Sequence, residues 1–155
     1  MAQEIERKFL VTGDGWRDAS IERHDIRQGY LATGERAAVR VRIANGRAIL
    51  NIKAAVLDIA RDEFEYEIPL HEGEAIVENL CEGAVIEKTR HVLEHQGVTW
   101  EVDEFHGVNA GLIVAEVELE SASQTFEWPA WLGDEVSGDP RYLNCNLVHK
   151  PYREW

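Results

Sequence analysis

The sequence predicts an α+β fold, in which eight short antiparallel strands form a β-barrel or a sandwich with helices packed on its outside. Eight short segments alternate between apolar and charged residues, which is the period of a strand with two different faces. Turn signals containing glycine separate several of these segments, and a single clear helical pattern occurs in the middle of the chain. Consecutive short strands joined by tight turns form meanders, which close into barrels or stack as sandwiches.

The strand-like segments occupy most of the first 120 residues. They are Glu4–Val11, Asp25–Ala32, Ala37–Ile43, Arg47–Val56, Arg61–Ile68, Val85–Glu94, Val98–Phe105 and Leu112–Ser121. Turns are expected at Thr33-Gly34, Asn45-Gly46 and Gln96-Gly97. Asn-Gly between two alternating segments is a strong signal for a two-residue β-hairpin, and Gln96-Gly97 predicts a second one.

Helices are expected in three places. Apolar residues at helical spacing predict a helix over His71–Cys81, which Gly83 would end. Gly13–Ser20 predicts a short helix that carries Trp16, and the aromatic tail after Ser121 predicts short helices packed across one end of the sheet. No repeat or linker divides the chain, so residues 1–155 are expected to form a single domain.

Composition excludes several classes of protein. The net charge of −13, from 29 acidic and 16 basic residues, argues against nucleic acid or an anionic membrane as a partner. No apolar segment is long enough to span a bilayer, and the N-terminus lacks the pattern of a secretory signal. Cys81 and Cys145 lie far apart and predict unpaired thiols, so a cytoplasmic location is expected.

Charges of one sign occupy whole strand faces. One strand places Arg40 and Arg42 on the same face, whereas another places Glu116 and Glu118 together. An ordinary half-buried sheet with its charged face in water is the simpler explanation for any single strand. Like charges on neighbouring positions repel, however, and solvated surfaces usually mix signs. The pattern therefore favours an inward charged face, where a polyphosphate and divalent cations would balance the two kinds of strand.

Several motifs together resemble a known family. The first is E-x-E-x-K, formed by Glu4, Glu6 and Lys8 near the N-terminus. The others, in order, are Val39–Arg42, Asn51–Lys53, Arg61–Glu65, Glu87–Arg90, Trp100–Asp103 and Ala115–Glu118. Their order and spacing resemble the CYTH domain, also called the triphosphate tunnel metalloenzyme family. The resemblance covers essentially the whole chain and is closest to short bacterial members that act on inorganic tripolyphosphate.

The resemblance implies a triphosphate bound inside an eight-stranded tunnel, together with Mg²⁺ or Mn²⁺, and hydrolysis of tripolyphosphate to pyrophosphate and phosphate. The implied catalytic residues are Lys8, Glu4 and Glu6. The implied substrate-binding residues are Lys8, Arg40, Arg42, Lys53, Lys88 and Arg90. The implied metal-binding residues are Glu4, Glu6, Glu116 and Glu118, with Glu63, Glu65 and Asp103 as supporting carboxylates.

Other functions remain as alternatives. Within the same family these are thiamine triphosphatase, nucleoside triphosphatase and adenylate cyclase. A non-catalytic polyphosphate-binding module is a different class, but anion binding alone would not require paired carboxylates. The expected partner is a small-molecule triphosphate, and a homodimer is left open. Glu67 and Glu120 are interpreted as structural, Arg61 is left without a role, and no basic residue in the tail clearly closes the tunnel.

Overall fold

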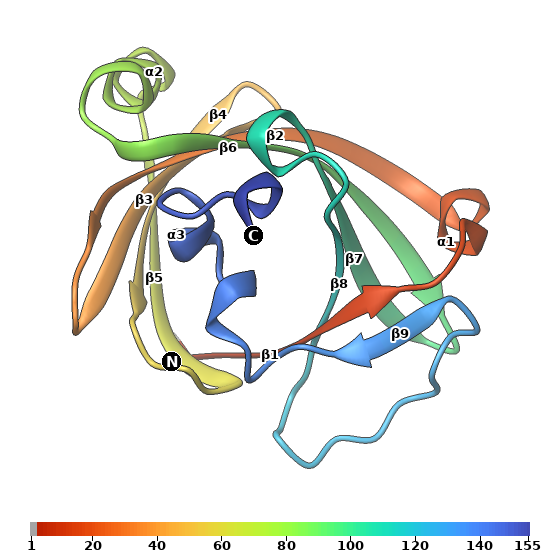
Figure 1. Ribbon diagram of the computed structural model, residues 1–155. Coiled ribbons are helices and arrows are strands. Elements are labelled where there is room, and N and C mark those ends of the chain that lie inside the picture. The colour runs from red at the N-terminus through yellow and green to blue at the C-terminus, as the bar shows by residue number, and fades with distance from the viewer. Residues whose placement is uncertain (1–2) are drawn as a thin grey trace.

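Residues 3–155 are described by a computed structural model, in which eight strands form a closed antiparallel barrel (Figure 1). The strands are β1 (Gln3–Val11), β2 (Ser20–Thr33), β3 (Ala37–Ala44), β4 (Arg47–Ala54), β5 (Ala60–Ile68), β6 (Glu82–His95), β7 (Val98–Phe105) and β8 (Ile113–Glu118), with a short β9 (Leu132–Glu135) added beside β1. The helices are α1 (Gly15–Asp18), α2 (Leu70–Asn79) and α3 (Asn144–Leu147), and the 3₁₀ turns are η1 (Gly107–Asn109), η2 (Pro140–Tyr142) and η3 (Tyr152–Glu154). None of the helices within residues 3–155 has the length and apolar character needed to span a membrane.

Strand β1 closes the barrel. The strand order is β5-β4-β3-β2-β6-β7-β8-β1-β9, and β1 also pairs with β5. The first part of β1 pairs with β5 through Gln3–Ile5, and the second part pairs with β8 through Glu6–Leu10. Adjacency of the first and eighth strands, which barrel closure requires, is therefore confirmed.

Both predicted hairpins are confirmed by their backbone angles. Asn45 and Gly46 have φ values of 54° and 70°, and Gln96 and Gly97 have φ values of 50° and 76°. A two-residue type I′ turn needs positive φ at both central positions, which glycine adopts freely and asparagine tolerates. The local sequence therefore determines how β3 joins β4 and how β6 joins β7.

The predicted element boundaries were wrong by several residues in places. Strand β2 begins at Ser20 and not at Asp25, and β6 begins at Glu82 and not at Val85. These two strands pair with each other along most of their length, so cross-strand hydrogen bonds extend them beyond the alternating residues. Strand β8 ends at Glu118, before the predicted Ser121, and β9 was not predicted. The helix predicted over His71–Cys81 is α2, which begins one residue earlier and ends two residues earlier than predicted.

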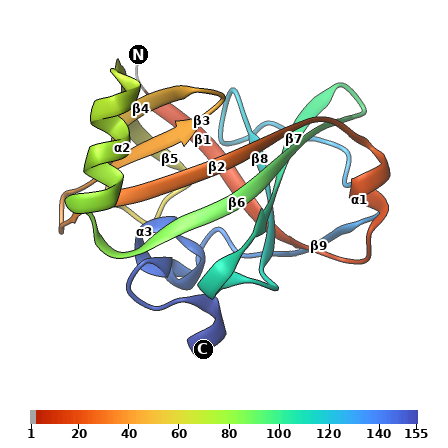
Figure 2. The same cartoon turned by 90° about the horizontal axis from the view of Figure 1, so that it is seen from above.

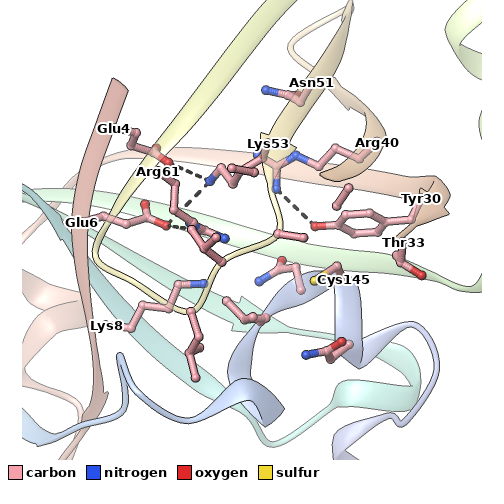
Figure 3. A pocket seen from close by; sticks show the side chains of 18 of the residues that line it. Glu4, Glu6, Lys8, Tyr30, Thr33, Arg40, Asn51, Lys53, Arg61 and Cys145 are labelled. Carbon is pink, nitrogen blue, oxygen red and sulfur yellow. Dashed lines mark hydrogen bonds and ion pairs between the residues drawn. The ribbon is translucent and has the colours of Figure 1, made fainter. Parts of the chain in front are cut away.

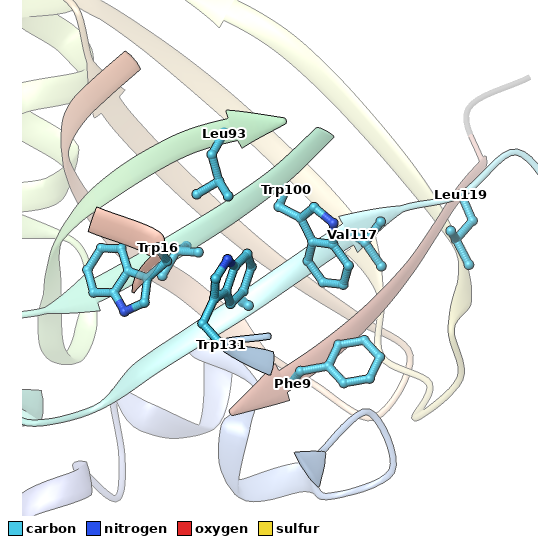
Figure 4. Close-up of a cluster of buried hydrophobic side chains, with 9 residues drawn as sticks. Phe9, Trp16, Leu93, Trp100, Val117, Leu119 and Trp131 are labelled. Atoms are coloured by element: carbon cyan, nitrogen blue, oxygen red, sulfur yellow. The ribbon is translucent and has the colours of Figure 1, made fainter. Parts of the chain in front are cut away.

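An apolar cluster covers the outside of the barrel on one side (Figure 4). Trp100 is fully buried there, with its ring centroid 5.8 Å from that of Phe9 and 5.5 Å from that of Trp131. Helix α1 brings Trp16 onto this cluster, and the segment before β9 brings Trp131. The outer cluster comprises Phe9, Trp16, Leu93, Trp100, Val102, Ala115, Val117, Leu119 and Trp131. These aromatic side chains therefore cover the outer apolar face of the barrel.

Helix α2 covers another part of the outer face, beside β3 and β4 (Figure 2). Val77 of this helix packs with Val41 and Ala48 of the sheet. Gly73 lies so close to Ala48 that a Cβ atom at this position would overlap the Ala48 side chain. Glycine at this position lets the helix approach the sheet closely.

The C-terminal segment fills one end of the barrel with apolar side chains. Tyr142 of η2, Leu147 of α3 and the following Val148 are buried against Ile86 and Phe105 of the strands. Figure 1 shows α3 and the last turns inside the outline of the barrel. The predicted short helices across one end are therefore confirmed. This end is closed by packing, which explains why the sequence shows no basic residue for that purpose.

Replacing Trp100 should strongly destabilise the protein. Trp100→Ala removes a fully buried ring from the outer cluster, and losses of about 3–5 kcal/mol are usual for such changes. Trp128→Ala is the matched control, because this side chain is 55% exposed, and we expect a loss of about 1 kcal/mol or less. Urea unfolding monitored by far-UV circular dichroism measures both. Similar losses for the two variants would contradict the importance of the outer cluster.

Candidate active site

The charged faces of the strands surround one cavity of about 500 Å³ inside the barrel (Figure 3). Of the residues predicted for the site, those lining this cavity are Glu4, Glu6, Lys8, Arg40, Arg42, Lys53, Glu65, Lys88, Arg90, Glu116 and Glu118. Glu63 and Asp103 are outside this lining but form ion pairs with residues that belong to it. The structure thus brings the predicted set together, while the individual roles stay predictions.

A buried carboxylate holds two of the cations. Asp103 is 1% exposed and accepts hydrogen bonds from Arg90 Nε at 2.7 Å and from Arg90 Nη2 at 2.8 Å. Lys88 Nζ donates to the same carboxylate at 2.8 Å. Although burial opposes ionisation of Asp103, the charges of Arg90 and Lys88 hold its pKa far below the usual range. Both oxygens therefore face cations of the protein, so Asp103 positions the basic residues.

Two other cations lack such a partner. Among the described residues, neither Arg40 nor Arg42 has a carboxylate oxygen within 4 Å, and their polar contacts go to the neutral side chains of Tyr30 and Gln28. Arg40 and burial, with Arg90, lower the pKa of Arg42 to about 10. The Nε atom of Arg40 is buried without a hydrogen-bond partner. These two guanidinium groups therefore have donors left over that an anion with several oxygens would suit.

The C-terminal segment contributes to the basic part of the cavity. Asn144 Oδ1 accepts hydrogen bonds from Gln28 Nε2 at 2.9 Å and from Lys88 Nζ at 3.0 Å. Gln28 Oε1 in turn accepts from Arg42 Nε at 3.2 Å. Burial lowers the pKa of Lys88 to about 7, with Arg90 and Arg42 adding to the effect, in spite of the contact with Asp103. A polyanion beside Lys88 would restore its charge.

Carboxylates gather on the side of the cavity formed by β1 and β5. Lys53 Nζ lies 2.7 Å from Glu4 Oε2, 3.3 Å from Glu63 Oε2 and 3.7 Å from Glu6 Oε1. Arg61, whose role the sequence left unassigned, places its Nη2 atom 3.2 Å from Glu6 Oε1. Burial and the neighbouring Glu63 raise the pKa of Glu4, whereas Lys53 and Lys8 outweigh burial and lower the pKa of Glu6.

Strand β8 places two further carboxylates beside β1. Glu6 and Glu118 are paired across the two strands, and so are Lys8 and Glu116. Lys8 Nζ lies 3.5 Å from Glu116 Oε1, and the charges of Glu116 and Glu6 overcome burial to raise the pKa of Lys8. Glu118 has no cation within 4 Å among the described residues, and partial burial together with Glu4 and Glu101 raises its pKa. This position would accept a cation.

The predicted site residues did not include Glu101, Tyr30 and Asn144, which line the cavity, or the buried Gln28, which contacts Arg42. Glu101 lies 3.1 Å from Arg90 Nη1, and its place beside Asp103 on an alternating strand was the signal that could have found it. Gln28 and Tyr30 lie on the inward face of β2, among polar and apolar residues that carry no charge pattern. Asn144 could not be found, because its place depends on how the tail packs.

Glu67 and the two cysteines have the surroundings that the sequence predicts, and His91 lies outside the cavity lining. Glu67 is exposed and pairs with Arg47 at 2.7 Å, which fits the structural role predicted for it. His91 packs against Trp16 with ring centroids 4.9 Å apart, on the outer face of the barrel. Cys81 and Cys145 are both free, as expected.

The geometry agrees with comparisons to known proteins. The model of the CYTH domain family matches residues 2–152. The chain belongs to the CYTH domain family. It is 47% identical to an inorganic triphosphatase of Acetivibrio thermocellus, over 100% of this chain and 99% of that protein. It is 35% identical to an inorganic triphosphatase of Nitrosomonas europaea, over 94% of this chain and 96% of that protein.

A solved structure supports the same assignment. The crystal structure of the inorganic triphosphatase NE1496 has a TM-score of 0.70 to this CYTH protein and 33% sequence identity, over 96% of this chain and 95% of that chain. The predicted fold and the predicted family are therefore confirmed.

Two arginines on the same side of the cavity should affect the stability of the empty protein in opposite directions. Arg42→Gln removes a cation that has no carboxylate partner and should stabilise the protein by about 1 kcal/mol. Arg90→Gln leaves Asp103 without its bidentate partner and should destabilise it by about 3–5 kcal/mol. Urea unfolding without phosphate or metal measures both, and a loss of stability in Arg42→Gln would show that Arg42 is not strained by Arg40.

Binding of a polyanion should bring a proton to Lys88. With its pKa near 7 in the empty cavity, Lys88 is largely neutral at about pH 8, and a bound polyanion raises this pKa. When tripolyphosphate binds at this pH, the parent protein should therefore take up about one proton more than the Lys88→Met variant does. Calorimetry in two buffers of different ionisation enthalpy measures the difference. Equal proton uptake would mean that Lys88 is already charged before binding.

Proposed function

We propose that this protein is a metal-dependent triphosphatase that hydrolyses inorganic tripolyphosphate to pyrophosphate and phosphate. The observation that carries the proposal is the pair Arg40 and Arg42, which lack carboxylate partners inside a cavity that also holds the carboxylates of β1 and β5. The Acetivibrio and Nitrosomonas relatives are named inorganic triphosphatases, and the first is similar over its whole length.

The basic residues account for substrate binding. Planar guanidinium groups donate two parallel hydrogen bonds to phosphate oxygens, which suits Arg40 and Arg42 as a clamp. Lys88 and Arg90 are already oriented by Asp103, so they meet the substrate without a further loss of side-chain freedom. Phosphoryl transfer depends mainly on this kind of positioning and charge neutralisation.

Lys8 is placed to act on the reacting phosphoryl group. Its raised pKa keeps the amine protonated, so it donates hydrogen bonds and cannot take a proton from water. It lies between the acidic pair of β1 and Glu116 of β8. We assign Lys8 to the charge that develops on the terminal phosphoryl group as the bond to the bridging oxygen breaks.

The carboxylates fit a divalent cation that is shared with the substrate. Within residues 3–155 no three His, Cys, Asp or Glu side chains form a ready-made metal cluster. Mg²⁺ is usually held by one or two carboxylates, phosphate oxygens and water, so this arrangement suits it. Glu4, Glu6, Glu116 and Glu118 are the carboxylates that would hold it, and Mn²⁺ is the alternative ion. When bound, such an ion neutralises phosphate charge and can activate water.

The proposal also includes the partners, the cellular location and the oligomeric state of the protein. The partner is a small-molecule triphosphate, with no role for nucleic acid or a membrane. The two free cysteines support the predicted cytoplasmic location. A homodimer remains a prediction.

A phosphate-release assay tests the function. We expect rapid hydrolysis of tripolyphosphate with Mg²⁺ or Mn²⁺, abolished by EDTA and restored by added metal. Thiamine triphosphate and ATP are the comparison substrates for the related activities. Glu116→Gln should lose at least about tenfold in turnover, which corresponds to about 1.4 kcal/mol, while its melting temperature confirms that it is folded. Full activity in thoroughly chelated protein would refute the role of a metal, and preference for another triphosphate would change the substrate.

A further inference from the structure

The ammonium group of Lys53 lies in the middle of three carboxylates. Its Nζ atom is within 4 Å of Glu4, Glu6 and Glu63, at the distances given above, and Figure 3 shows it beside the first two. The carboxylates come from β1 and β5, whereas Lys53 comes from β4. The lysine thus occupies a position that is surrounded by acidic oxygens on two strands.

Lys53 contacts Glu4 and Glu63 by electrostatic attraction and not by well-directed hydrogen bonds. Glu4 Oε2 and Glu63 Oε2 are both buried, and neither has a hydrogen-bond partner of acceptable geometry, although Lys53 Nζ lies 2.7 Å and 3.3 Å away. A metal ion attracts carboxylate oxygens without the direction that an N–H bond imposes. The ammonium therefore stands where an inorganic cation would interact with the same oxygens.

The local charges are not balanced by Lys53. Among the described residues, Lys53 and Arg61 are the two cations within 4 Å of Glu4, Glu6 and Glu63, so the carboxylates in contact outnumber the cations. Lys8 attracts Glu6 from farther away and is itself paired with Glu116. Glu118 increases this excess, because it is paired with Glu6 across β1 and β8 and has no cation within 4 Å among the described residues. If Lys53 left, a divalent cation would neutralise this acidic region better than one ammonium group does.

The position of Lys53 in the sheet also puts its ammonium group within reach of the strand that carries Arg40 and Arg42. Lys53 pairs with Glu63 on β5 and with Ala38 on β3, next to the inward-facing Arg40. Its flexible four-carbon stem therefore stands between the acidic strand and the strand of the unpartnered arginines. A phosphate bound at those arginines would attract the ammonium away from the carboxylates.

We propose that Lys53 is a tethered cation that occupies the Glu4, Glu6 and Glu63 carboxylates until a triphosphate draws it to the basic side. Its departure frees these oxygens for a divalent cation. The carboxylate oxygens lie farther from Nζ than the ~2.1 Å of a Mg–oxygen bond, so they must move closer when a metal ion replaces the ammonium. This agrees with the lack of a ready-made metal cluster among residues 3–155. The role of the triphosphate rests on the proposed function, but competition between Lys53 and metal does not require hydrolysis.

Mn²⁺ binding to the substrate-free protein tests this competition. The electron paramagnetic resonance signal of free Mn²⁺ gives the affinity directly, without phosphate and without turnover. Lys53→Gln should bind Mn²⁺ at least about tenfold more tightly than the parent, because a positive charge no longer occupies the site. Arg42→Gln is the matched control: it loses the same charge but contacts none of the three carboxylates, so its affinity should change by about twofold or less.

Equal Mn²⁺ affinity in the parent and Lys53→Gln would overturn the proposal, and so would an equal gain in both variants, which would reflect net charge alone. If Lys53→Gln does not fold, the parent protein supplies the test. At saturating Mn²⁺ the released Lys53 amine should be acylated faster relative to the exposed Lys150, as measured by peptide mass spectrometry. Unchanged labelling would also overturn it. If Lys53→Gln binds Mn²⁺ more tightly but the parent protein releases no phosphate from tripolyphosphate, only the proposed function is refuted.

Discussion

The ion pair between Asp103 and Arg90, joined by Lys88, is the interaction on which the cavity depends. It holds two cations with one carboxylate in the interior, where isolated charges would be strongly unfavourable. Asp103 neutralises only two of the basic side chains in the cavity. Arg40 and Arg42 are left over, and their mutual repulsion is the free energy that a bound polyanion can relieve. The unpaired arginines therefore raise the affinity for a polyanion but lower the stability of the empty protein.

A charged interior also determines where the hydrophobic core must lie. Because the inward faces of the strands carry charge, the apolar faces point outward and need cover. Helix α1 and the segment before β9 cover the side around Trp100, and α2 covers the side around Val41. The C-terminal turns fill one end of the barrel, where the inward faces become apolar at Ile86 and Phe105. The substrate cavity occupies the remaining, polar part of the interior.

The separation of charge by strand makes the cavity responsive to ligands. Lys53 and Lys8 each lie among carboxylates of the cavity, and under the proposed function both also meet the bound phosphate. Neutralising the phosphate and neutralising the carboxylates are thus linked through the same side chains. In the empty protein, cross-strand ion pairs such as Lys8 with Glu116 and Arg90 with Asp103 offset the repulsion between like charges.

The sequence alone determined the features that depend on local alternation. Period-two patterns identified the strand faces, the Asn45-Gly46 turn identified a hairpin, and the E-x-E-x-K motif with its companions identified the family. Only the tertiary structure decided which charges meet. The partners of Asp103 and the position of Lys53 depend on strand register around a closed barrel, and Asn144 reaches Lys88 from 56 positions away in the chain. Distances between such residues follow from long-range packing, which leaves no signal in local spacing.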